Sequence, residues 1–360
     1  MKYEYNHFIA ENVAPKGATK ILVKGKNGGV VASVPLGKLA PPSLENKLYS
    51  FGVFSDVHVN TTYNTIAYNR FKNAVKYLAD EEGVDFICIA GDLTNSGTES
   101  DIKEYIALAK ASKEQCTNQI EIHDTTGNHD VQTTALTKAY LQGYADGIEP
   151  YASRELYYSF TKGNDIFIIF GMTAWPGKTG ELYSSASYDW LEQTINANKD
   201  KRCFLFSHPP YFTYDSASGK VCDSGSGAIV GMAPPTGTYI QWYADSAPRF
   251  KNALNSHPNL VWFHGHSHIE FFRQEVASYV NYCRENFESN TLLGCHSVHV
   301  PSLAAGREPT ADGTGWTAPA NIRGGEGYVV DVYQDCIHVR GCDFVNEKSV
   351  PIATYCLDTV

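Results

Sequence analysis

Side chains of the types that bind metal ions occur in five short motifs, each directly after a run of apolar residues. The motifs lie at residues 55–58, 91–92, 127–130, 208 and 265–268. Apart from His129 and Asp130, their ligand-type side chains are two aspartates, one asparagine and four histidines: Asp56, Asp92, Asn128, His58, His208, His266 and His268. Imidazole and carboxylate without thiolate form a ligand set that suits zinc, iron or manganese.

The spacing within the motifs also favours metal binding. Asp56 and His58 are two residues apart, so both side chains lie on one face of an extended segment. The same holds for His266 and His268. A carboxylate can bridge two cations about 3.5–4 Å apart, as in two-metal hydrolases. Each motif alone is common, but all five in this order indicate one metal centre.

The segments between the motifs predict alternating strands and helices. Strands are expected at 48–56, 84–92, 120–130, 165–172, 202–210 and 259–268, and helices at 64–83, 101–113, 133–143 and 188–200. This alternation predicts an α/β fold, and all five motifs would then follow strand ends at the carboxyl edge of a sheet. The tail at 327–344 alternates in polarity and predicts two antiparallel strands, so a second sheet should be mixed.

Residues 1–45 differ from the rest of the chain and predict an N-terminal β appendage with a linker, leaving 46–360 as the main domain. Two apolar runs flank a Lys-Asn-Gly-Gly turn, which is a hairpin signal. The hairpin either packs on the main domain or docks a partner. Long irregular loops at 211–247 and 299–326 are expected to contact substrate. Their aromatic residues either stack on a base or leaving group or anchor the loops: Tyr211, Phe212, Tyr214, Tyr239, Trp242 and Tyr243.

Composition excludes several classes of protein. Hydrophobic residues make up 43% of the 360 positions, which indicates a globular chain and not a disordered one. No apolar run approaches the roughly 20 residues that a membrane helix needs, so no membrane partner is expected. The formal net charge of -10 argues against binding of long nucleic acid. No secretory signal is evident at the N-terminus, which favours a cytoplasmic location with reduced thiols, although a disulfide between Cys336 and Cys342 is an alternative.

Taken together, the five motifs resemble those of the calcineurin-like metallophosphoesterase superfamily. That pattern is Asp-x-His, Gly-Asp, Gly-Asn-His-Asp/Glu, His and Gly-His-x-His, and every part is present here in order. The resemblance covers roughly residues 50–345 and leaves residues 1–45 outside. It implies a four-layer αββα sandwich with two mixed β sheets, which agrees with the α/β pattern, and it implies a metal-dependent hydrolase of phosphoester bonds.

The resemblance also implies a dinuclear centre with two divalent or trivalent metal ions, either Mn, Fe or Zn. Carried over by position, one metal would be bound by Asp56, His58, Asp92 and His268, and the other by Asp92, Asn128, His208 and His266, with Asp92 bridging. His129 would act as general acid or transition-state stabiliser, and Asp130 would orient it through a hydrogen bond. A hydroxide that bridges the two metals would attack phosphorus.

Within the superfamily the motifs are most similar to the cyclic-nucleotide phosphodiesterase branch. Purple acid phosphatases carry a tyrosine ligand where this chain has Asn95, and protein Ser/Thr phosphatases carry an arginine where it has Ser96. We therefore expect small-molecule phosphoester substrates, with phosphodiesters slightly favoured. The alternatives are a phosphomonoesterase, a nuclease of the same superfamily, and a non-catalytic module stapled by metals within a larger assembly. His129 and Asp130 argue against the last, because a structural site does not need them.

Other histidines and cysteines fit less clear roles. His264 either orients a ligand from behind or is a satisfied buried histidine, and His123 is expected to be structural. Four further residues are of types that bind zinc, but their spacing does not match a structural zinc pattern and argues against a second zinc site: Cys283, Cys295, His296 and His299.

Overall fold

The computed structural model describes most of the predicted main domain together with short strands near the N-terminus. The described residues are 2–4, 7–9, 20–24, 30–35, 46–60, 65–131, 155–174, 182–209, 212–215, 220–223, 249–250, 252–257, 259–266, 268, 270–271, 295–306, 308–309, 316–317 and 324–358. Several predictions lie outside them: the helix at 133–143, much of the loops at 211–247 and 299–326, Tyr211, Tyr239, Trp242, Tyr243 and Cys283.

Six strands form the first sheet, which is mixed. In sheet order they are β19 (Lys348–Asp358), β18 (Cys336–Asp343), β17 (Glu326–Tyr333), β5 (Lys47–Phe54), β6 (Phe86–Ile89) and β7 (Glu121–Asp124). The strands β5, β6 and β7 run parallel, whereas β17, β18 and β19 are antiparallel additions from the C-terminal end. The predicted antiparallel tail is therefore confirmed, and β19 extends it by one strand.

Five strands form the second sheet, which is also mixed. In sheet order they are β14 (His296–His299), β13 (Leu260–His264), β10 (Cys203–Phe206), β9 (Asp165–Phe170) and β8 (Tyr157–Lys162). All neighbours are parallel except β8, which pairs with β9 as an antiparallel edge strand. Every residue of β9, β10 and β13 is buried, as expected for parallel strands covered on both faces.

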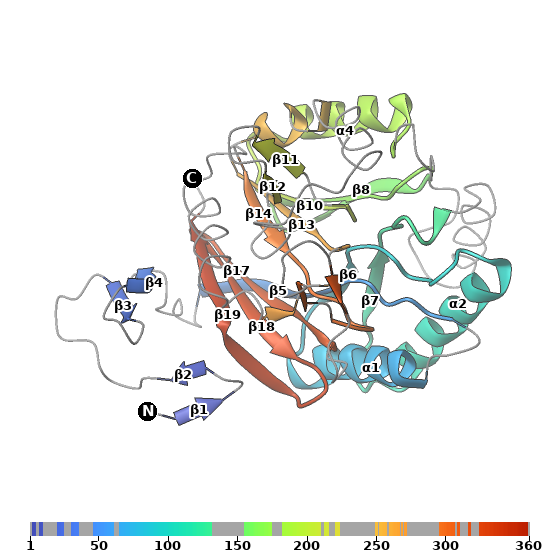
Figure 1. Cartoon of the computed structure of the whole chain (residues 1–360). Helices are drawn as coiled ribbons and strands as arrows, with labels where there is room; N and C mark the ends of the chain where they lie inside the picture. Colours follow the sequence, from blue (N-terminus) through green and yellow to red (C-terminus); the bar gives the residue numbers. More distant parts are fainter. Residues whose placement is uncertain are drawn as a thin grey trace.

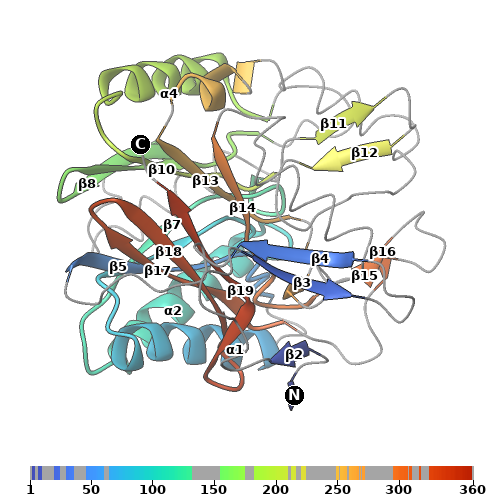
Figure 2. The ribbon, with the colours of Figure 1, turned by 90° about the vertical axis from the view of Figure 1, so that its left-hand side faces the viewer.

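The two sheets pack face to face between helices, which gives the predicted four-layer αββα sandwich (Figures 1 and 2). The helices α1 (Thr65–Lys76) and α2 (Glu99–Glu114) lie outside the first sheet, and α4 (Ser185–Ala197) lies outside the second. A one-turn π-helix, η3 (Tyr77–Glu81), continues α1. Within the described part of the chain, no helix is long and apolar enough to span a membrane.

Aromatic rings fill the space between the sheets. Phe51 of β5 stacks on Phe86 of the neighbouring strand with ring centroids 5.5 Å apart. It also meets Phe167 and Phe204 of the second sheet edge to face, each at 5.2 Å. All four side chains are almost fully buried. Such edge-to-face pairs stabilise the packing beyond the area that they bury, so the sheets hold one another in a fixed register.

A buried polar cluster joins the two sheets at the edge opposite the motifs. Arg202 donates to both carboxylate oxygens of Asp165, at 3.2 and 2.7 Å, and to the carbonyl of Tyr333 at 2.6 Å. The Tyr49 hydroxyl donates to the same carboxylate. The cluster links β5 and β17 of one sheet to β9 and the start of β10 in the other, and so anchors the base of the sandwich.

Residues before position 46 contain two antiparallel strand pairs. The predicted hairpin is confirmed as β3 (Lys20–Lys24) paired with β4 (Val30–Pro35). A second pair, β1 (Lys2–Glu4) with β2 (His7–Ile9), was not predicted. Two further short pairs lie in the long loops: β11 (Phe212–Asp215) with β12 (Lys220–Asp223), and β15 (Glu308–Pro309) with β16 (Trp316–Thr317). Cys336 and Cys342 are not joined in a disulfide, so the alternative pairing is not present in the structure.

Candidate dinuclear metal centre

The five motifs meet where strands of both sheets end. Residues 55–58 follow β5, residues 91–92 follow β6, and residues 127–130 follow β7 of the first sheet. His208 follows β10 and residues 265–268 follow β13 of the second sheet. These strands run parallel within each sheet, so their carboxyl ends lie at one edge. The sandwich thereby brings all seven predicted ligands into one centre.

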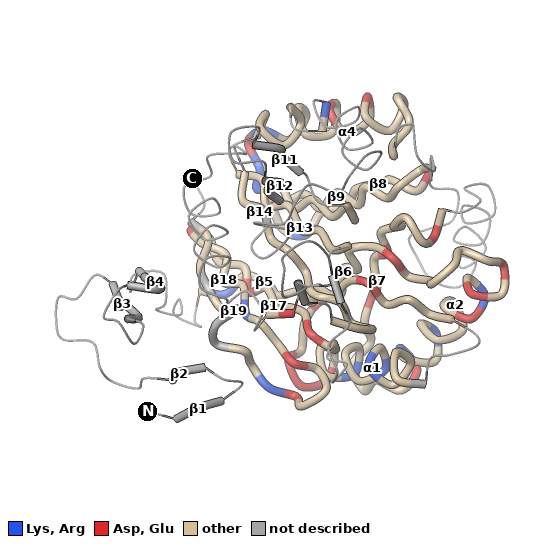
Figure 3. The backbone as a smooth tube through the Cα atoms, in the orientation of Figure 1, with Lys and Arg blue, Asp and Glu red and all other residues tan. Residues whose placement is uncertain are grey.

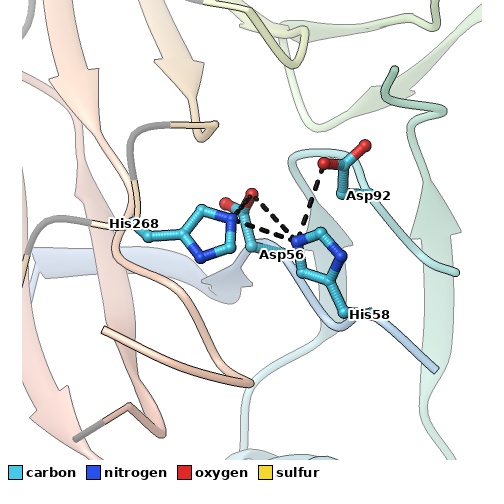
Figure 4. A group of neighbouring side chains, drawn as sticks. All are labelled: Asp56, His58, Asp92 and His268. Carbon is cyan, nitrogen blue, oxygen red and sulfur yellow. Dashed lines mark hydrogen bonds and ion pairs between the residues drawn. The ribbon is translucent and has the colours of Figure 1, made fainter. Parts of the chain in front are cut away.

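The first group of side chains consists of Asp56, His58, Asp92 and His268, shown in Figure 4. Their candidate ligand atoms all lie within 4.8 Å of one another, and the side chains are buried. His268 Nε2 lies 2.9 Å from Asp56 Oδ1. His58 Nε2 lies 3.7 Å from Asp56 Oδ1 and 3.7 Å from Asp92 Oδ2. Two carboxylates and two imidazoles thus surround one point.

The second group consists of Asp92, His208 and His266, again within 4.8 Å of one another. His208 Nε2 lies 3.0 Å from Asp92 Oδ2. The amide oxygen of Asn128 lies 2.9 Å from His266 Nδ1, which places Asn128 beside the same group. Asp92 is the one residue common to both groups. A carboxylate in that position is placed to bridge two cations.

Backbone carbonyls fix the orientation of two of the imidazoles. His208 Nδ1 lies 2.8 Å from the carbonyl oxygen of Ala90, and His268 Nδ1 lies 3.0 Å from that of Ala305. A carbonyl oxygen can only accept, so Nδ1 is the donor in both rings. In the neutral rings the Nε2 lone pairs therefore point into the centre. This is the usual way in which proteins set the tautomer of a metal-binding histidine.

The backbone is strained at the same positions. Six non-glycine residues have positive φ in the described part of the chain, and five of them belong to the centre: Asp56, His58, Asp92, His266 and His268, with φ between 49° and 76°. The remaining one is Glu347. Left-handed backbone costs of order 1–3 kcal/mol for such residues and concentrates at functional sites. The strain identifies the centre independently of side-chain chemistry.

Backbone amides hold the outer oxygens of both aspartates. His266 N–H donates to Asp56 Oδ2 at 3.1 Å, and His129 N–H donates to Asp92 Oδ1 at 2.9 Å. The other oxygen of each carboxylate is left facing the cluster. Burial alone would raise the pKa of both carboxyl groups. Instead, His268 and His208 hold the pKa of Asp56 well below its usual range, and His208 chiefly does the same for Asp92.

Two histidines of the centre have pKa values that are shifted in opposite directions by their surroundings. Burial alone would lower the pKa of His208, but the Asp92 and Asp56 carboxylates raise it to about 9. Burial, together with the nearby His208, lowers the pKa of His266 to about 3. Without a cation, one proton on His208 therefore offsets part of the negative charge of the two carboxylates.

The residues fit a pair of divalent cations. Asp56 Oδ1 and His208 Nε2 are fully buried, and neither makes a hydrogen bond of acceptable geometry with a described residue. His58 Nε2 and His268 Nε2 face each other at 3.0 Å. Buried lone pairs that converge in this way are costly unless a positive charge lies between them. Imidazole, carboxylate and amide oxygen are ligands that zinc, iron and manganese accept.

The structure corrects the expected role of Asp130. His129 Nδ1 donates to the carbonyl oxygen of Asn95 at 2.6 Å, so this carbonyl orients the ring. The Asp130 carboxylate instead accepts from the amides of Leu93, Thr94 and Gly127, at 2.8–3.1 Å, and from the Thr94 hydroxyl at 2.9 Å. Asp130 therefore ties the loop after β6 to the loop after β7, and it acts on His129 only through that frame.

Two of the remaining histidines lie apart from the ligand atoms. His123 stacks on Phe160 at 3.8 Å between ring centroids and contacts the Tyr158 hydroxyl at 3.2 Å, which agrees with a structural role. His264 is fully buried against Trp262, with His299 at 5.7 Å between ring centroids. His264 in β13 and His299 in β14 both lie behind the centre. A second zinc site would require Cys283, which lies outside the described residues.

Sequence reasoning missed the backbone groups that orient the rings. The carbonyls of Ala90, Asn95 and Ala305 make these contacts, and a carbonyl leaves no signal in the choice of side chain. The glycines next to the ligands give partial signals. At Gly265 a Cβ would lie 1.9 Å from Ser55 Oγ, and at Gly127 it would lie 2.2 Å from Asp92 Oδ1. Only glycine fits at these two positions.

Comparison with known proteins agrees with this geometry. Residues 49–270, more than half of the chain, match the family model of the calcineurin-like phosphoesterases. A search of curated proteins finds no match. Among solved structures, a dimetal phosphatase from Danio rerio is similar with a TM-score of 0.51 at 12% identity, covering 87% of this chain and 100% of its own.

Purple acid phosphatase PPD1 from yellow lupin (Lupinus luteus) seeds is similar with a TM-score of 0.52 at 14% identity. The match covers 86% of this chain and 53% of the lupin chain, so this chain corresponds to about half of that enzyme. At such identities the two structures show a shared fold. The family-model match, which covers more than half of the chain, shows that the chain belongs to the calcineurin-like phosphoesterase family, a family of metal-dependent phosphoesterases.

Proposed function

We propose that the chain hydrolyses phosphoesters at a dinuclear metal centre in which Asp92 bridges the two ions. The observation that carries this proposal is the presence of Asp92 in both groups of candidate ligands. One ion would be held by Asp56, His58, Asp92 and His268, and the other by Asp92, Asn128, His208 and His266. Metals bound there would supply positive charge for the phosphoryl oxygens and lower the pKa of water towards neutrality.

His129 is proposed to act on the substrate and not on a metal. It is only partly buried, and its ring lies 4.8 Å from that of His58, at the side of the centre. Because Nδ1 donates to the Asn95 carbonyl, Nε2 is the atom that remains to face a bound phosphoester. A doubly protonated ring would donate from Nε2 to a phosphoryl or leaving oxygen, which is general-acid chemistry.

Phosphodiesters are proposed as the better substrates, with monoesters as the alternative. A monoester carries up to two negative charges near neutral pH, since its second pKa is about 6, whereas a diester carries one. Ser96 stands where Ser/Thr phosphatases place an arginine, so this position offers no cation for the second charge. The similarity of the motifs to the cyclic-nucleotide phosphodiesterase branch supports the same choice.

A small substrate, in a reducing cytoplasmic setting, is part of the proposal. The chain carries a formal net charge of -10, which disfavours long nucleic acid. In Figure 3 the positions of Lys and Arg are scattered among those of Asp and Glu along the described backbone. A pair of dications would offset the local negative charge enough for a small phosphoester to bind.

Turnover of a p-nitrophenyl phosphodiester and of the matching monoester tests the proposal. The protein is stripped of metal, reloaded with manganese and compared with Asp92→Asn. Faster turnover of the diester that disappears in the variant is the expected result. A preference for the monoester would replace the substrate class but keep the metal chemistry. Equal turnover by wild type and Asp92→Asn would overturn the proposal.

A further inference from the structure

Residues 302–306 form a short segment that lies beyond the family-model match and crosses the end of β5. After β14, Ser302 forms an isolated parallel bridge with Ser55. Leu303 N–H then donates to the Ser55 carbonyl at 2.8 Å, and Ala304 N–H donates to the Asp56 carbonyl at 3.1 Å. The segment thus runs beside the loop that carries the first ligand.

The hydroxyl of Ser302 lies at the middle of a hydrogen-bonded chain between two candidate ligands. Ser302 is buried, and its Oγ donates to the carbonyl oxygen of Asp56 at 3.1 Å. The same Oγ accepts from Ala305 N–H at 3.0 Å. The carbonyl of Ala305 in turn accepts from His268 Nδ1 at 3.0 Å. One side chain therefore connects the Asp56 backbone to the His268 ring.

Asp56 needs this support because its backbone is strained. Its φ is 53°, in the left-handed region. Its N–H donates to the Gly91 carbonyl at 3.0 Å, and its carbonyl accepts from both Ala304 N–H and Ser302 Oγ. A non-glycine residue keeps such a conformation only where surrounding contacts determine it. Ser302 supplies the only side-chain contact among these three.

The segment is itself held on its outer side. Arg70 of α1 donates to the carbonyl of Ala304, and Gly325 N–H donates to the carbonyl of Leu303 at 2.8 Å. Gly306 packs directly on buried Glu270, where a Cβ would lie 2.1 Å from Oε1. The segment therefore has little freedom to move away from the ligands that it contacts.

We propose that Ser302 is a positioning residue that holds Asp56 and His268 in the arrangement needed to bind one of the two metals. It touches neither metal nor substrate, and it acts through the Asp56 carbonyl and the Ala305 peptide. The inference rests on the proposed dinuclear function. Loss of the hydroxyl frees the ring of His268 and the backbone of Asp56 together, so the ion held by Asp56, His58 and His268 should be lost before the ion held by His208 and His266.

Manganese binding measures this effect without relying on turnover. Metal-stripped wild type, Ser302→Ala and Ser302→Thr are titrated with Mn²⁺ by calorimetry, and the electron paramagnetic resonance spectrum is recorded at each ratio. Ser112→Ala is the matched control, because Ser112 is also fully buried and its hydroxyl donates to the Leu108 carbonyl at 2.7 Å, inside α2.

Wild type should bind two ions and give the spectrum of a coupled manganese pair. In Ser302→Ala one ion should bind about 10–100-fold more weakly, the range found for groups that orient metal ligands, and single-ion signals should replace the pair. Ser302→Thr keeps the hydroxyl and should restore the pair, and Ser112→Ala should match wild type. If Ser302→Ala does not fold, Ser302→Cys keeps a similar volume with a weaker donor and should show an intermediate loss.

Two results would overturn the inference. In the first, wild type binds a coupled pair and Ser302→Ala binds it equally tightly, which leaves the proposed function intact. In the second, Ser112→Ala loses the pair as far as Ser302→Ala does, which makes the effect one of general stability. Failure of wild type itself to bind two ions would instead contradict the proposed function, so the two failures are distinct.

Discussion

Asp92 is constrained at both carboxylate oxygens and at its backbone. Its Oδ1 accepts the amide of His129, its Oδ2 lies 3.0 Å from His208 Nε2, and its backbone is left-handed with φ of 51°. The glycine before it also has positive φ and no room for a side chain, since a Cβ there would lie 2.4 Å from the His208 ring. Residues 91–92 are thus shaped for one purpose, to place a carboxylate between two groups of ligands.

Asp92→Asn should lower manganese affinity by more than about 100-fold, because a direct ligand counts for more than the groups that orient ligands. Turnover should fall with the metal. Metal content after dialysis and kcat on a p-nitrophenyl phosphodiester provide the check. Asp165→Asn is the matched control: it neutralises a buried aspartate paired with Arg202 and should reduce stability while leaving the metal bound. Equal metal content in wild type and Asp92→Asn would contradict the bridging role.

His129→Ala should separate catalysis from metal binding. The ring makes no candidate ligand contact in either group, so both ions should remain. Turnover should fall by about 10²–10⁴-fold, the usual contribution of a general acid. The measurement pairs metal content with kcat for leaving groups of different basicity. The loss should be greatest for the poorest leaving group, and an equal loss for all of them would argue against proton donation by His129.

At the scale of single residues, the sequence predicts the candidate ligand side chains well and the hydrogen-bond partners that orient them poorly. All seven candidate ligands follow from residue type and motif order, and the resemblance to the family places Asp92 between the two groups. The hydrogen-bond partner of His129 cannot be predicted in this way. Asp130 is its neighbour in sequence, yet the Asp130 carboxylate accepts from the amides of Leu93 and Gly127. Ser302 could not be found at all, since it lies more than thirty residues after the last motif and contacts backbone only.

Parallel strands position the centre, and their ends determine which groups become buried. The strands β13 and β14 continue directly into the centre and carry His264 and His299, which are fully buried. Burial lowers the pKa of His264 well below its usual range and lowers that of His299 to about 3. Both rings are therefore neutral in the folded protein at mildly acidic pH.

These two histidines should make the metal-free protein less stable in acid. In the unfolded chain both rings take up protons near pH 6.5, whereas His299 in the folded protein stays neutral down to about pH 3. The folded protein therefore loses stability as the pH falls below about 6.5, by about 1.4 kcal/mol per pH unit for each ring that stays neutral in the folded state.

Urea unfolding of wild type and His299→Gln at pH 7 and pH 5.5 checks this sign. The free energy of unfolding should drop with acid in both proteins, because the lowered pKa values of His264 and His266 act in the same direction as that of His299 and together outweigh His208, whose raised pKa acts in the opposite direction. The drop should be smaller in the variant, which has one such ring fewer. An equal drop in the two proteins would mean that folding does not lower the pKa of His299.

Elements were predictable where apolar residues followed a clear period. The strands β6, β9, β10 and β13 are short apolar runs that precede polar motifs, and the structure places each within the predicted range. The π-helical turn η3 was not predictable, because its residues continue the pattern of α1 without a break. The strand β19 was missed because it contains Pro351, which interrupts the alternation expected of a strand.

The two sheets of the sandwich are joined by a buried polar cluster at one edge and carry the candidate metal ligands at the opposite edge. The buried cluster of Arg202, Asp165 and Tyr49 joins the two sheets at the base. The ligand loops of both sheets meet at the opposite edge. Neither sheet alone holds a complete set of ligands, because His208, His266 and His268 come from one and Asp56, His58, Asp92 and Asn128 from the other. Docking of the sheets therefore creates the centre.

Residues 1–45 should be dispensable for this centre. The strand pairs β1 with β2 and β3 with β4 form separate two-stranded sheets and contribute no strand to either sheet of the sandwich. A chain that starts at residue 46 should keep manganese binding and turnover within about twofold of wild type, and its thermal midpoint should change by only a few °C. A large loss of stability would show instead that residues 1–45 pack on the sandwich as part of its core.

The central claim is that two metal ions share the Asp92 carboxylate, and anomalous diffraction from crystals soaked in manganese tests it most directly. Two peaks should appear about 3.5–4 Å apart. One should lie among Asp56, His58 and His268, the other among Asn128, His208 and His266, and the Asp92 carboxylate should contact both. A single peak under saturating manganese, or a pair that Asp92 does not touch, would contradict the account.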